Sequence, residues 1–198
     1  PIHSSAASDV YKRQIKAILK KTNVDPLEID EVILGQVLPS LGGQNPARQA
    51  LIKSGIPKEK TAFNINQVCG SGLRAIVLGY QSIGMGSSKF VIAGGQESMS
   101  NSDEKEMLTN GLIDAFNNYH MGVTAENVAE KFNISRDEQD HFALDSQSKT
   151  ENSIKSKKFL SEIIDNNQDE HPRFNLNIES LKKLKPAFKK DGTVTAGN

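Results

Sequence analysis

The fold is decided by residues 61–84, which read TAFNINQVCGSGLRAIVLGYQSIG. Apolar side chains recur along the first eight of these residues and predict a strand over residues 61–68. The glycines of CGSG predict a tight turn around Cys69. From Ser71 to Gly84 apolar residues occupy one broad helical face, which predicts a helix buried on most of its sides. A strand that leads through a glycine turn into an apolar helix is typical of α/β proteins.

The same alternation continues on both sides of this stretch. Helices are expected over residues 9–22 and 46–54, and strands over residues 31–38 and 89–93. Strands that alternate with helices pair in parallel, so residues 9–95 predict an α/β layer with a largely parallel sheet.

The second half of the chain has a different pattern. Residues 97–118 are mixed and loop-like, and residues 124–132 predict a helix. Ser135 and Glu138 have the spacing of a capping box, which predicts a helix that begins there and runs to about residue 156. Residues 165–177 are polar and predict a loop.

Composition excludes several classes of partner and site. Lys+Arg and Asp+Glu number 24 each, so no net field is expected to attract nucleic acid or an acidic membrane. The sequence has no apolar run approaching the roughly 20 residues that cross a membrane. Its single cysteine excludes an internal disulfide framework and a zinc site made of cysteines. A lone thiol suits a reducing compartment, so we expect a cytoplasmic protein without a metal site.

Cys69 is the candidate nucleophile. At the start of a helix its sulfur would face free backbone N–H groups and the positive end of the helix dipole, both of which favour a thiolate. Gly70 and Gly72 would leave room for a substrate to approach. A single cysteine can equally be a small buried apolar residue. Local sequence alone leaves these two interpretations about equal.

Residues 66–75, NQVCGSGLRA, resemble the nucleophile motif of the thiolase family. Further segments resemble the family in the family's own order, and the resemblance extends over about residues 15–198. They are GQV at 35–37, GQNPARQ at 43–49, AGGQESMS at 93–100, HMG at 120–122, TAENVA at 124–129, SRDEQD at 135–140, LKPAF at 184–188 and GTVTAGN at 192–198.

The resemblance implies a particular fold. Thiolases have two similar α/β halves, each with a mixed, mostly parallel five-stranded sheet and helices on both faces, and the first half carries an inserted loop domain that holds coenzyme A. We therefore expect an α/β core over residues 9–100, the inserted domain over 101–185 and a return toward the core over 186–198. Residues 1–14 do not match the family pattern. The family's second half carries further catalytic groups, so this chain by itself is expected to be nearly inactive.

The resemblance also implies a reaction. Cys69 matches the cysteine that takes an acyl group from a thioester, and a second acetyl-CoA then accepts that group to give acetoacetyl-CoA; thiolysis is the reverse. His120 and Met121 match a pair that lines the pantetheine channel, and Leu112 matches an apolar residue of the same pocket, although each could be purely structural. The resemblance implies neither a metal nor a redox cofactor, and it implies a homodimer or tetramer for the intact protein.

Two other functions remain open within this resemblance. One is a 3-ketoacyl-CoA thiolase of fatty-acid β-oxidation, and the other is a noncatalytic thiolase-like protein that binds acyl-CoA. Among the remaining polar residues, Glu97 and Ser98 are expected to support the turn beneath Cys69, and His141 and His171 to be structural or on the surface. The lysines at 182, 183, 185, 189 and 190 are expected to form a solvated face rather than a phosphate site.

Overall fold

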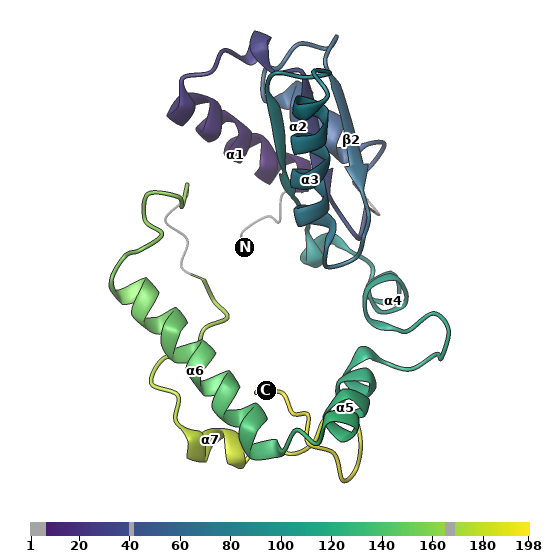
Figure 1. Ribbon diagram of the computed structural model, residues 1–198, viewed down its shortest axis with the longest axis vertical. Helices are drawn as coiled ribbons and strands as arrows, with labels where there is room; N and C mark the ends of the chain where they lie inside the picture. The colour runs from purple at the N-terminus through teal and green to yellow at the C-terminus, as the bar shows by residue number, and fades with distance from the viewer. Residues whose placement is uncertain (1–6, 40–41, 165–168) are drawn as a thin grey trace. The chain divides into compact units, whose positions relative to one another are not determined.

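The computed structural model of the chain describes residues 7–39, 42–164 and 169–198. It divides into two compact units, Pro1–Gly111 and Leu112–Asn198 (Figure 1). Each unit is described by itself below.

A parallel sheet forms the centre of the first unit. Its strands are β1 (Glu31–Gly35), β2 (Thr61–Ile65) and β3 (Val91–Gly95), in the order β2-β1-β3. The strands are in register, so Gly35 at the end of β1 lies opposite Ile65 and Gly95. The predicted parallel sheet is confirmed, with three strands rather than five in the described part of the chain.

Helices cover both faces of this sheet, as predicted. α1 (Ala7–Thr22) and α2 (Pro46–Lys53) pack on the face that carries Val32 and Leu34, where they form the apolar core. α3 (Ser71–Gly84) packs on the opposite face. Tyr11 lies in the core, so part of the segment 1–14, which we expected to fall outside the family pattern, contributes to the fold.

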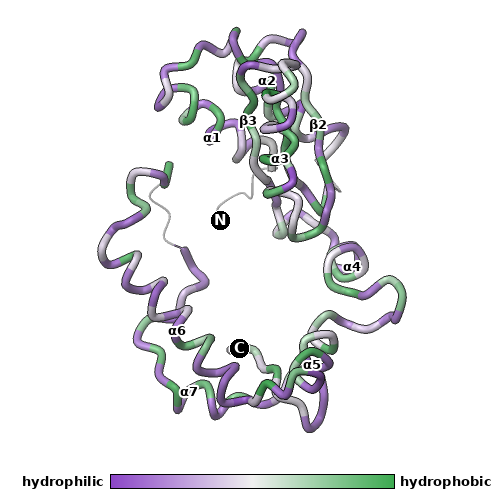
Figure 2. Tube along the Cα trace, in the orientation of Figure 1, coloured by the Kyte–Doolittle hydropathy of each residue, from purple (hydrophilic) through white to green (hydrophobic). Residues whose placement is uncertain are grey.

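Small residues bring α3 close to the sheet. Ser71, Ala75 and Gly79 are buried, and a Cβ atom at Gly79 would lie only 3.0 Å from Cγ1 of Val91. The larger apolar side chains of α3 point away from the sheet, with Leu73 70% exposed and neighbouring large residues exposed as well. Figure 2 shows this apolar character along α3. The prediction of a helix buried on most sides is therefore wrong for the described chain. The stripe of α3 that faces the sheet consists of small residues, and the large apolar residues lie on the exposed side.

Side chains accept the backbone N–H groups that follow β1 and β2, and the strands end there. β1 and β2 end before residues 38 and 68, where we had predicted their ends. Glu97 accepts the N–H groups of Val37 and Leu38, and Asn66 accepts that of Val68. These amides are therefore taken by side chains instead of a neighbouring strand.

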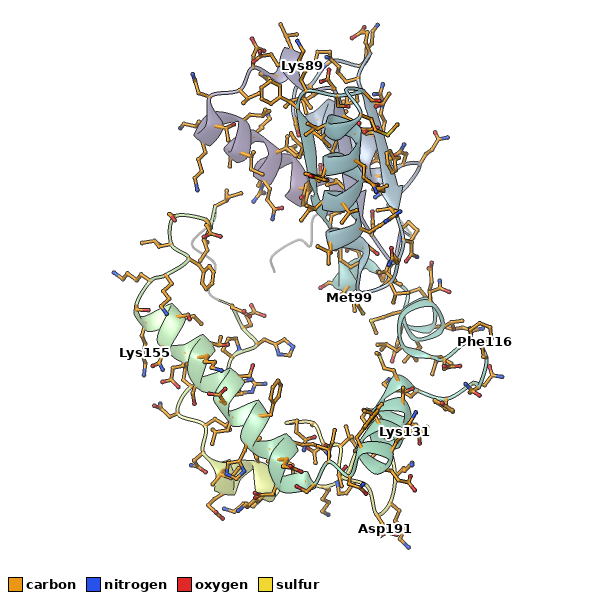
Figure 3. All side chains as sticks on the ribbon, in the orientation of Figure 1. Lys89, Met99, Phe116, Lys131, Lys155 and Asp191 are labelled. Carbon is orange, nitrogen blue, oxygen red and sulfur yellow. The ribbon has the colours of Figure 1, made fainter. Side chains whose placement is uncertain are left out.

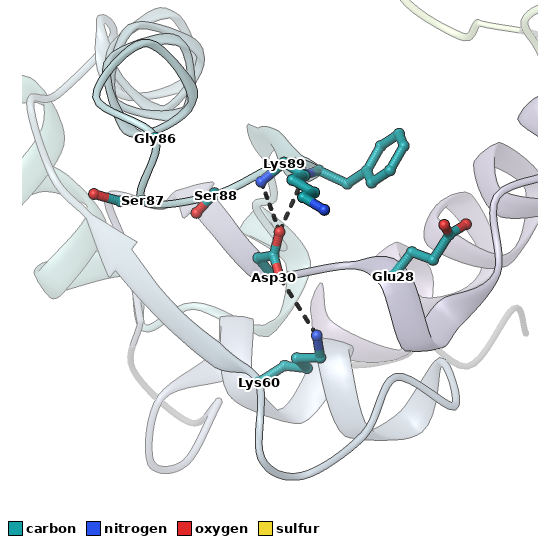
Figure 4. A pocket seen from close by; sticks show the side chains of 8 residues that line it. Glu28, Asp30, Lys60, Gly86, Ser87, Ser88 and Lys89 are labelled. Atoms are coloured by element: carbon teal, nitrogen blue, oxygen red, sulfur yellow. Dashed lines mark hydrogen bonds and ion pairs between the residues drawn. The ribbon is translucent and has the colours of Figure 1, made fainter.

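Asp30 connects the segments that lead into the three strands, at the end of the sheet away from Cys69. Its carboxylate accepts the N–H groups of Lys89 (2.7 Å) and Phe90 (3.2 Å), and the Lys60 ammonium lies 3.4 Å away (Figure 4). The two backbone N–H groups, followed by Lys60, hold the pKa of Asp30 below its ordinary value. Asp30 also lines a pocket of about 380 Å³, in which the charges of Glu28 and Asp30 are balanced by those of Lys60 and Lys89. We interpret Asp30 as a structural clamp.

Short helical turns occupy the regions between the main elements. η1 (Pro26–Glu28) precedes β1, and η2 (Met99–Asn101), α4 (Glu104–Met107) and the π-helical turn η3 (Leu108–Leu112) lie within residues 97–118, which we had predicted to be loop-like. Asp103 caps α4 by accepting the N–H group of Glu106. Phe116 follows in a turn organised by Asp114 and is 94% exposed (Figure 3).

The second unit is helical. It contains α5 (Met121–Phe132), α6 (Arg136–Lys155) and α7 (Ile178–Lys182). The capping box of Ser135 and Glu138 is present, as predicted. The sequence did not predict α7, a single turn capped by the Asn177 side chain. None of the helices in the described ranges combines the length and apolarity that crossing a membrane requires. Residues 165–168 of the predicted loop 165–177 lie outside the described ranges.

Two buried carboxylates hold residues 193–198 against α5 and α6. Glu126 of α5 is 5% exposed and accepts the N–H groups of Thr193 (2.9 Å) and Val194 (2.8 Å). Asp140 of α6 is fully buried and accepts bonds from Arg136 and from the Asn198 side chain. We expected residues 186–198 to return toward the α/β core; these particular contacts are with α5 and α6.

Substitutions of Leu51 in α2 and Leu73 in α3 test which face of each helix is buried in the fold. Leu51→Ala should lower the free energy of unfolding by about 2–5 kcal/mol, because Leu51 is fully buried. Leu73→Ala should change it by less than about 0.5 kcal/mol, because Leu73 is mostly exposed. Urea unfolding followed by circular dichroism measures both values. A comparable loss for the two variants would show that the outer face of α3 is covered in solution.

Glu126 should make the second unit sensitive to acid. Burial opposes ionisation of its carboxyl, but the N–H groups of Thr193 and Val194 outweigh that effect and hold the pKa of Glu126 below its ordinary value of 4.5. The stabilisation is therefore fully present above pH 4.5 and is lost as the pH falls through the lower folded-state pKa.

Glu126→Gln should cost about 1–3 kcal/mol at neutral pH, because it places an uncharged group against these N–H groups. It should also flatten the loss of stability in acid. The control is Glu130→Gln, since Glu130 is exposed and should change stability by less than about 0.5 kcal/mol. Equal acid profiles for wild type and Glu126→Gln in urea unfolding would contradict this account.

Candidate active site

Cys69 lies in the turn between β2 and α3 and is exposed. The turn is closed by Ser71, whose hydroxyl donates to the Val68 carbonyl (2.6 Å) and accepts the N–H group of Gln67 (2.9 Å). Val68 has a φ of 47°, a left-handed conformation that is unusual for a β-branched residue. This closed, strained turn places Cys69 directly before the first turn of α3.

The N-cap position of α3 is occupied by a glycine. This N-cap residue, Gly70, has no side chain that could accept an N–H group of the helix. The N–H groups of Gly70 and Ser71 donate to the carbonyls of Gln67 and Val68. The later N–H groups of the first turn, together with the helix dipole, attract negative charge. Cys69 therefore lies directly before a helix start whose N–H groups can face a developing oxyanion.

Glycines allow this helix start to rest on the sheet. A Cβ atom at Gly35 would lie 2.5 Å from the carbonyl carbon of Ser71 and 2.7 Å from the nitrogen of Gly72. Gly95, opposite Gly35 in the sheet, would place a Cβ atom 3.7 Å from the Cα atom of Gly72. Only glycine at Gly35 lets the backbone of α3 come this close.

Buried amides connect the same ends of the three strands on the other side of the sheet. Oε1 of Gln36 accepts bonds from Asn64 (3.0 Å) and Gln96 (2.9 Å). Asn64 in turn accepts the N–H group of Ala47 at the start of α2. Gln36 and Gln96 are buried, and Oε1 of Gln96 has no partner within the described ranges. This network fixes the strand ends that support the Cys69 turn.

Glu97 and Ser98 act on neighbouring loops. Glu97 binds the amides that follow β1, at Val37 and Leu38. Ser98 accepts a hydrogen bond from Asn101 within the turn that follows. The expectation that they support the Cys69 turn is therefore corrected, because their bonds go to the segments after β1 and β3.

The other three candidate residues lie in the second unit. An isolated antiparallel bridge pairs Ile113 with His120, and it places Leu112 and Met121 next to the two bridged residues in the chain. Leu112 and His120 are partly buried, whereas Met121 is exposed. The structure thus brings Leu112, His120 and Met121 into one region, and Cys69 lies in the first unit.

His120 also begins α5. Its Nδ1 accepts the N–H group of Gly122 at 3.0 Å, so the imidazole serves as the N-cap. Its ring stacks on that of Phe188, with ring centres 4.8 Å apart. α5 therefore begins at Met121, earlier than the predicted residue 124.

Comparison with known proteins shows the family of the chain. The family described as "Thiolase, N-terminal domain" matches residues 2–108 and 102–198. The chain belongs to the thiolase family. An acetyl-CoA acetyltransferase of Rhizobium meliloti (strain 1021) is 48% identical over 98% of this chain and 56% of its own length. A probable acetyl-CoA acyltransferase of Staphylococcus aureus (strain COL) is 46% identical over 97% of this chain and 56% of its own length.

A solved thiolase structure supports the fold. The crystal structure of the Bacillus anthracis acetyl-CoA acetyltransferase has a TM-score of 0.87, is 34% identical, and covers all of this chain and 56% of that protein. The thiolase resemblance predicted from the motifs is confirmed. The match begins at residue 2 and takes in residues 2–14, which we had expected not to resemble a thiolase. The chain spans just over half the length of these relatives.

The remaining polar candidates of this thiolase chain have structural partners or face solvent. Lys182 lies 3.6 Å from Asp137, and Lys189 lies 3.7 Å from Glu130. His171 is exposed. Within the described ranges no three His, Cys, Asp or Glu residues form a group that could hold a metal ion.

Sequence reasoning missed the residues that organise the turn and the second unit. Gln36 and Gln96 directly follow strands that end in glycine. That pattern could have predicted buried amides at the ends of the strands. Glu126 shares a helical face with Gly122 and Ala129, and an acid between such small residues is a signal for a buried carboxylate. Phe188 gave no such signal, because its partners lie far away in the sequence.

Gly35→Ala tests the close approach of α3 to β1. The added methyl group would collide with the backbone of Ser71 and Gly72, so we expect a loss of about 1–3 kcal/mol in the free energy of unfolding. The matched control is Gly72→Ala, where nothing lies within 4 Å of the added atom. That change should be neutral or stabilise by about 0.5–1 kcal/mol, because Gly72 is helical. Equal effects in thermal or urea unfolding would refute the proposed packing.

Proposed function

We propose that the intact protein is a thiolase that joins two molecules of acetyl-CoA into acetoacetyl-CoA, with Cys69 as the acyl carrier. The Cys69 thiolate attacks the thioester carbonyl carbon, a new C–S bond forms, and coenzyme A leaves as its thiolate. The methyl carbon of a second acetyl-CoA loses a proton and attacks the acyl-cysteine carbonyl. A carbon–carbon bond forms, and the Cys69 thiolate leaves.

The exposed position of Cys69 at the uncapped start of α3 is the observation that carries this proposal. The N–H groups of that turn suit the thiolate before attack and the carbonyl oxygen during it. The relatives named as acetyl-CoA acetyltransferases support acetyl-CoA as the substrate. The family resemblance assigns the base that activates the cysteine, and the group that handles the α-proton, to the second half of a thiolase.

Residues of the second unit would bind the substrate. Leu112, His120 and Met121 would line the channel of the pantetheine arm, in line with their resemblance to the family's residues there. Thioester exchange between thiols needs no metal or redox cofactor. An exposed free thiol suits a reducing compartment such as the cytoplasm. We expect the intact protein to form a homodimer or tetramer.

Acylation of Cys69 tests the proposal. After the intact protein is mixed with acetyl-CoA, trypsin should release Thr61–Arg74 carrying one acetyl group on Cys69, in stoichiometric amount by mass spectrometry. This peptide contains no lysine, so a stray acetyl group on an amine cannot mimic the result. Cys69→Ser should lose both the acetylated peptide and turnover.

Ser87→Ala provides the matched control, since Ser87 lies at the other edge of the sheet, and it should retain acylation. Full turnover by Cys69→Ala would refute the assignment of the nucleophile. Tight binding of acetyl-CoA without any acylation would instead favour a noncatalytic acyl-CoA-binding protein.

A further inference from the structure

Val68 has a backbone conformation that its side chain disfavours. Its φ of 47° lies in the left-handed region, where the Cβ atom crowds the carbonyl that follows. Of the other non-glycine residues with positive φ in the described ranges, five are asparagines, which tolerate this region, and one is Lys157. The side chain of Val68 is 47% exposed, so packing in the core does not impose the conformation.

Hydrogen bonds fix the peptide planes on both sides of Val68. In the plane before it, the N–H group of Val68 donates to Oδ1 of Asn66 (2.9 Å). The carbonyl of Gln67, in the same plane, accepts the N–H group of Gly70 (3.0 Å). In the plane after it, the carbonyl of Val68 accepts both the hydroxyl (2.6 Å) and the N–H group (3.1 Å) of Ser71. A negative φ would rotate one plane against the other and break the bonds on one side.

The side chains that bind Val68 are themselves held by the end of β1. Ser71 is buried, and its backbone lies against this strand end, where Gly35 leaves room for it. Nδ2 of Asn66 donates to the carbonyl of Val37, which follows β1 (3.4 Å). The sheet therefore determines where both partners of Val68 lie.

The strained residue directly precedes the candidate nucleophile. The peptide plane that Ser71 holds includes the backbone nitrogen of Cys69, so a relaxed φ at Val68 would turn the chain at the point where it enters Cys69. Residues persist in such conformations only where the surrounding structure determines them, and they gather at active sites.

We infer that Asn66 and Ser71 are positioning residues for acyl transfer: they hold Val68 in the left-handed conformation, and that conformation sets the orientation in which Cys69 meets the thioester. Both act through the backbone of Val68 rather than on the substrate. The role in acyl transfer rests on the proposed function, whereas the hold on Val68 does not.

Removing the hydroxyl of Ser71 and then the strain at Val68 tests this inference. In the intact protein, Ser71→Ala should slow acylation of Cys69 by acetyl-CoA about 10–100-fold, because a small displacement of a reacting group is that costly. Adding Val68→Asn should bring the rate to within about fivefold of wild type, since asparagine adopts the left-handed conformation more easily than valine. Rapid quenching and mass spectrometry measure the rates. A double variant no faster than Ser71→Ala, or a Ser71→Ala variant as fast as wild type, would overturn the inference.

Ser82→Ala is the matched control. It removes a hydroxyl from the same helix, one that lies 2.8 Å from the hydroxyl of Ser88 at the far end of α3, and it should not slow acylation. Where Ser71→Ala does not fold, Asn66→Ala serves instead, because it removes the acceptor of the Val68 N–H group. Val68→Asn should rescue acylation in that variant too, and a failure to do so would count against the inference in the same way.

The unfolding midpoint tests the strain by itself. Val68→Asn in the otherwise unchanged protein should raise the midpoint by about 1–3 °C, because the new side chain fits the left-handed conformation. Differential scanning calorimetry measures this shift. A lower midpoint would show that Val68 is not strained, and the inference would fail.

Alkylation of Cys69 by iodoacetamide distinguishes a failure of this inference from a failure of the proposed function. If the proposed function fails, wild type takes up no acetyl group from acetyl-CoA. The alkylation rate then decides, and it should fall in Ser71→Ala and recover when Val68→Asn is added. Equal alkylation rates in wild type, Ser71→Ala and the double variant would in that case overturn the positioning role of Ser71.

Discussion

The close contact between the first turn of α3 and the end of β1 is the constraint on which the candidate active site depends. A side chain at Gly35 would occupy the space of the Ser71 and Gly72 backbone. Because the helix start rests directly on the sheet, the Cys69 turn between β2 and α3 is held in a strained, exposed position. The same stripe of small residues continues along α3 and leaves its large apolar side chains facing outward.

Polar side chains rather than apolar packing fix the two ends of the sheet. At the start of the strands, Asp30 gathers two backbone amides and a lysine. At the other end, the amides of Gln36 and Gln96 connect the strands beneath the Cys69 turn. The second unit uses the same principle, because the buried carboxylates of Glu126 and Asp140 hold its last residues. The buried groups of Gln36, Glu126 and Asp140 are costly to bury unless they are bonded, so each specifies one arrangement of the chain.

Sequence patterns predicted the elements that depend on local chemistry. The glycine turn at Cys69 and the capping box at Ser135 follow from residues that are neighbours in the chain, and the parallel strands follow from the alternation of strands and helices; the structure has all three. The patterns failed where distant partners decide the outcome. The broad apolar face of α3 suggested burial, but the contact surface is set by how closely Gly79 and Ala75 can approach the sheet. The stacking of His120 on Phe188 joins residues that no periodicity relates.

The reactivity of Cys69 tests the central claim most directly. The claim is that a glycine turn holds Cys69 exposed directly before the first turn of α3, beside backbone N–H groups that can stabilise negative charge. The measurement is the rate of alkylation by iodoacetamide at neutral pH, in the folded chain and in the same chain unfolded in urea. The account predicts that Cys69 reacts faster when the chain is folded. A slower reaction in the folded chain would contradict it.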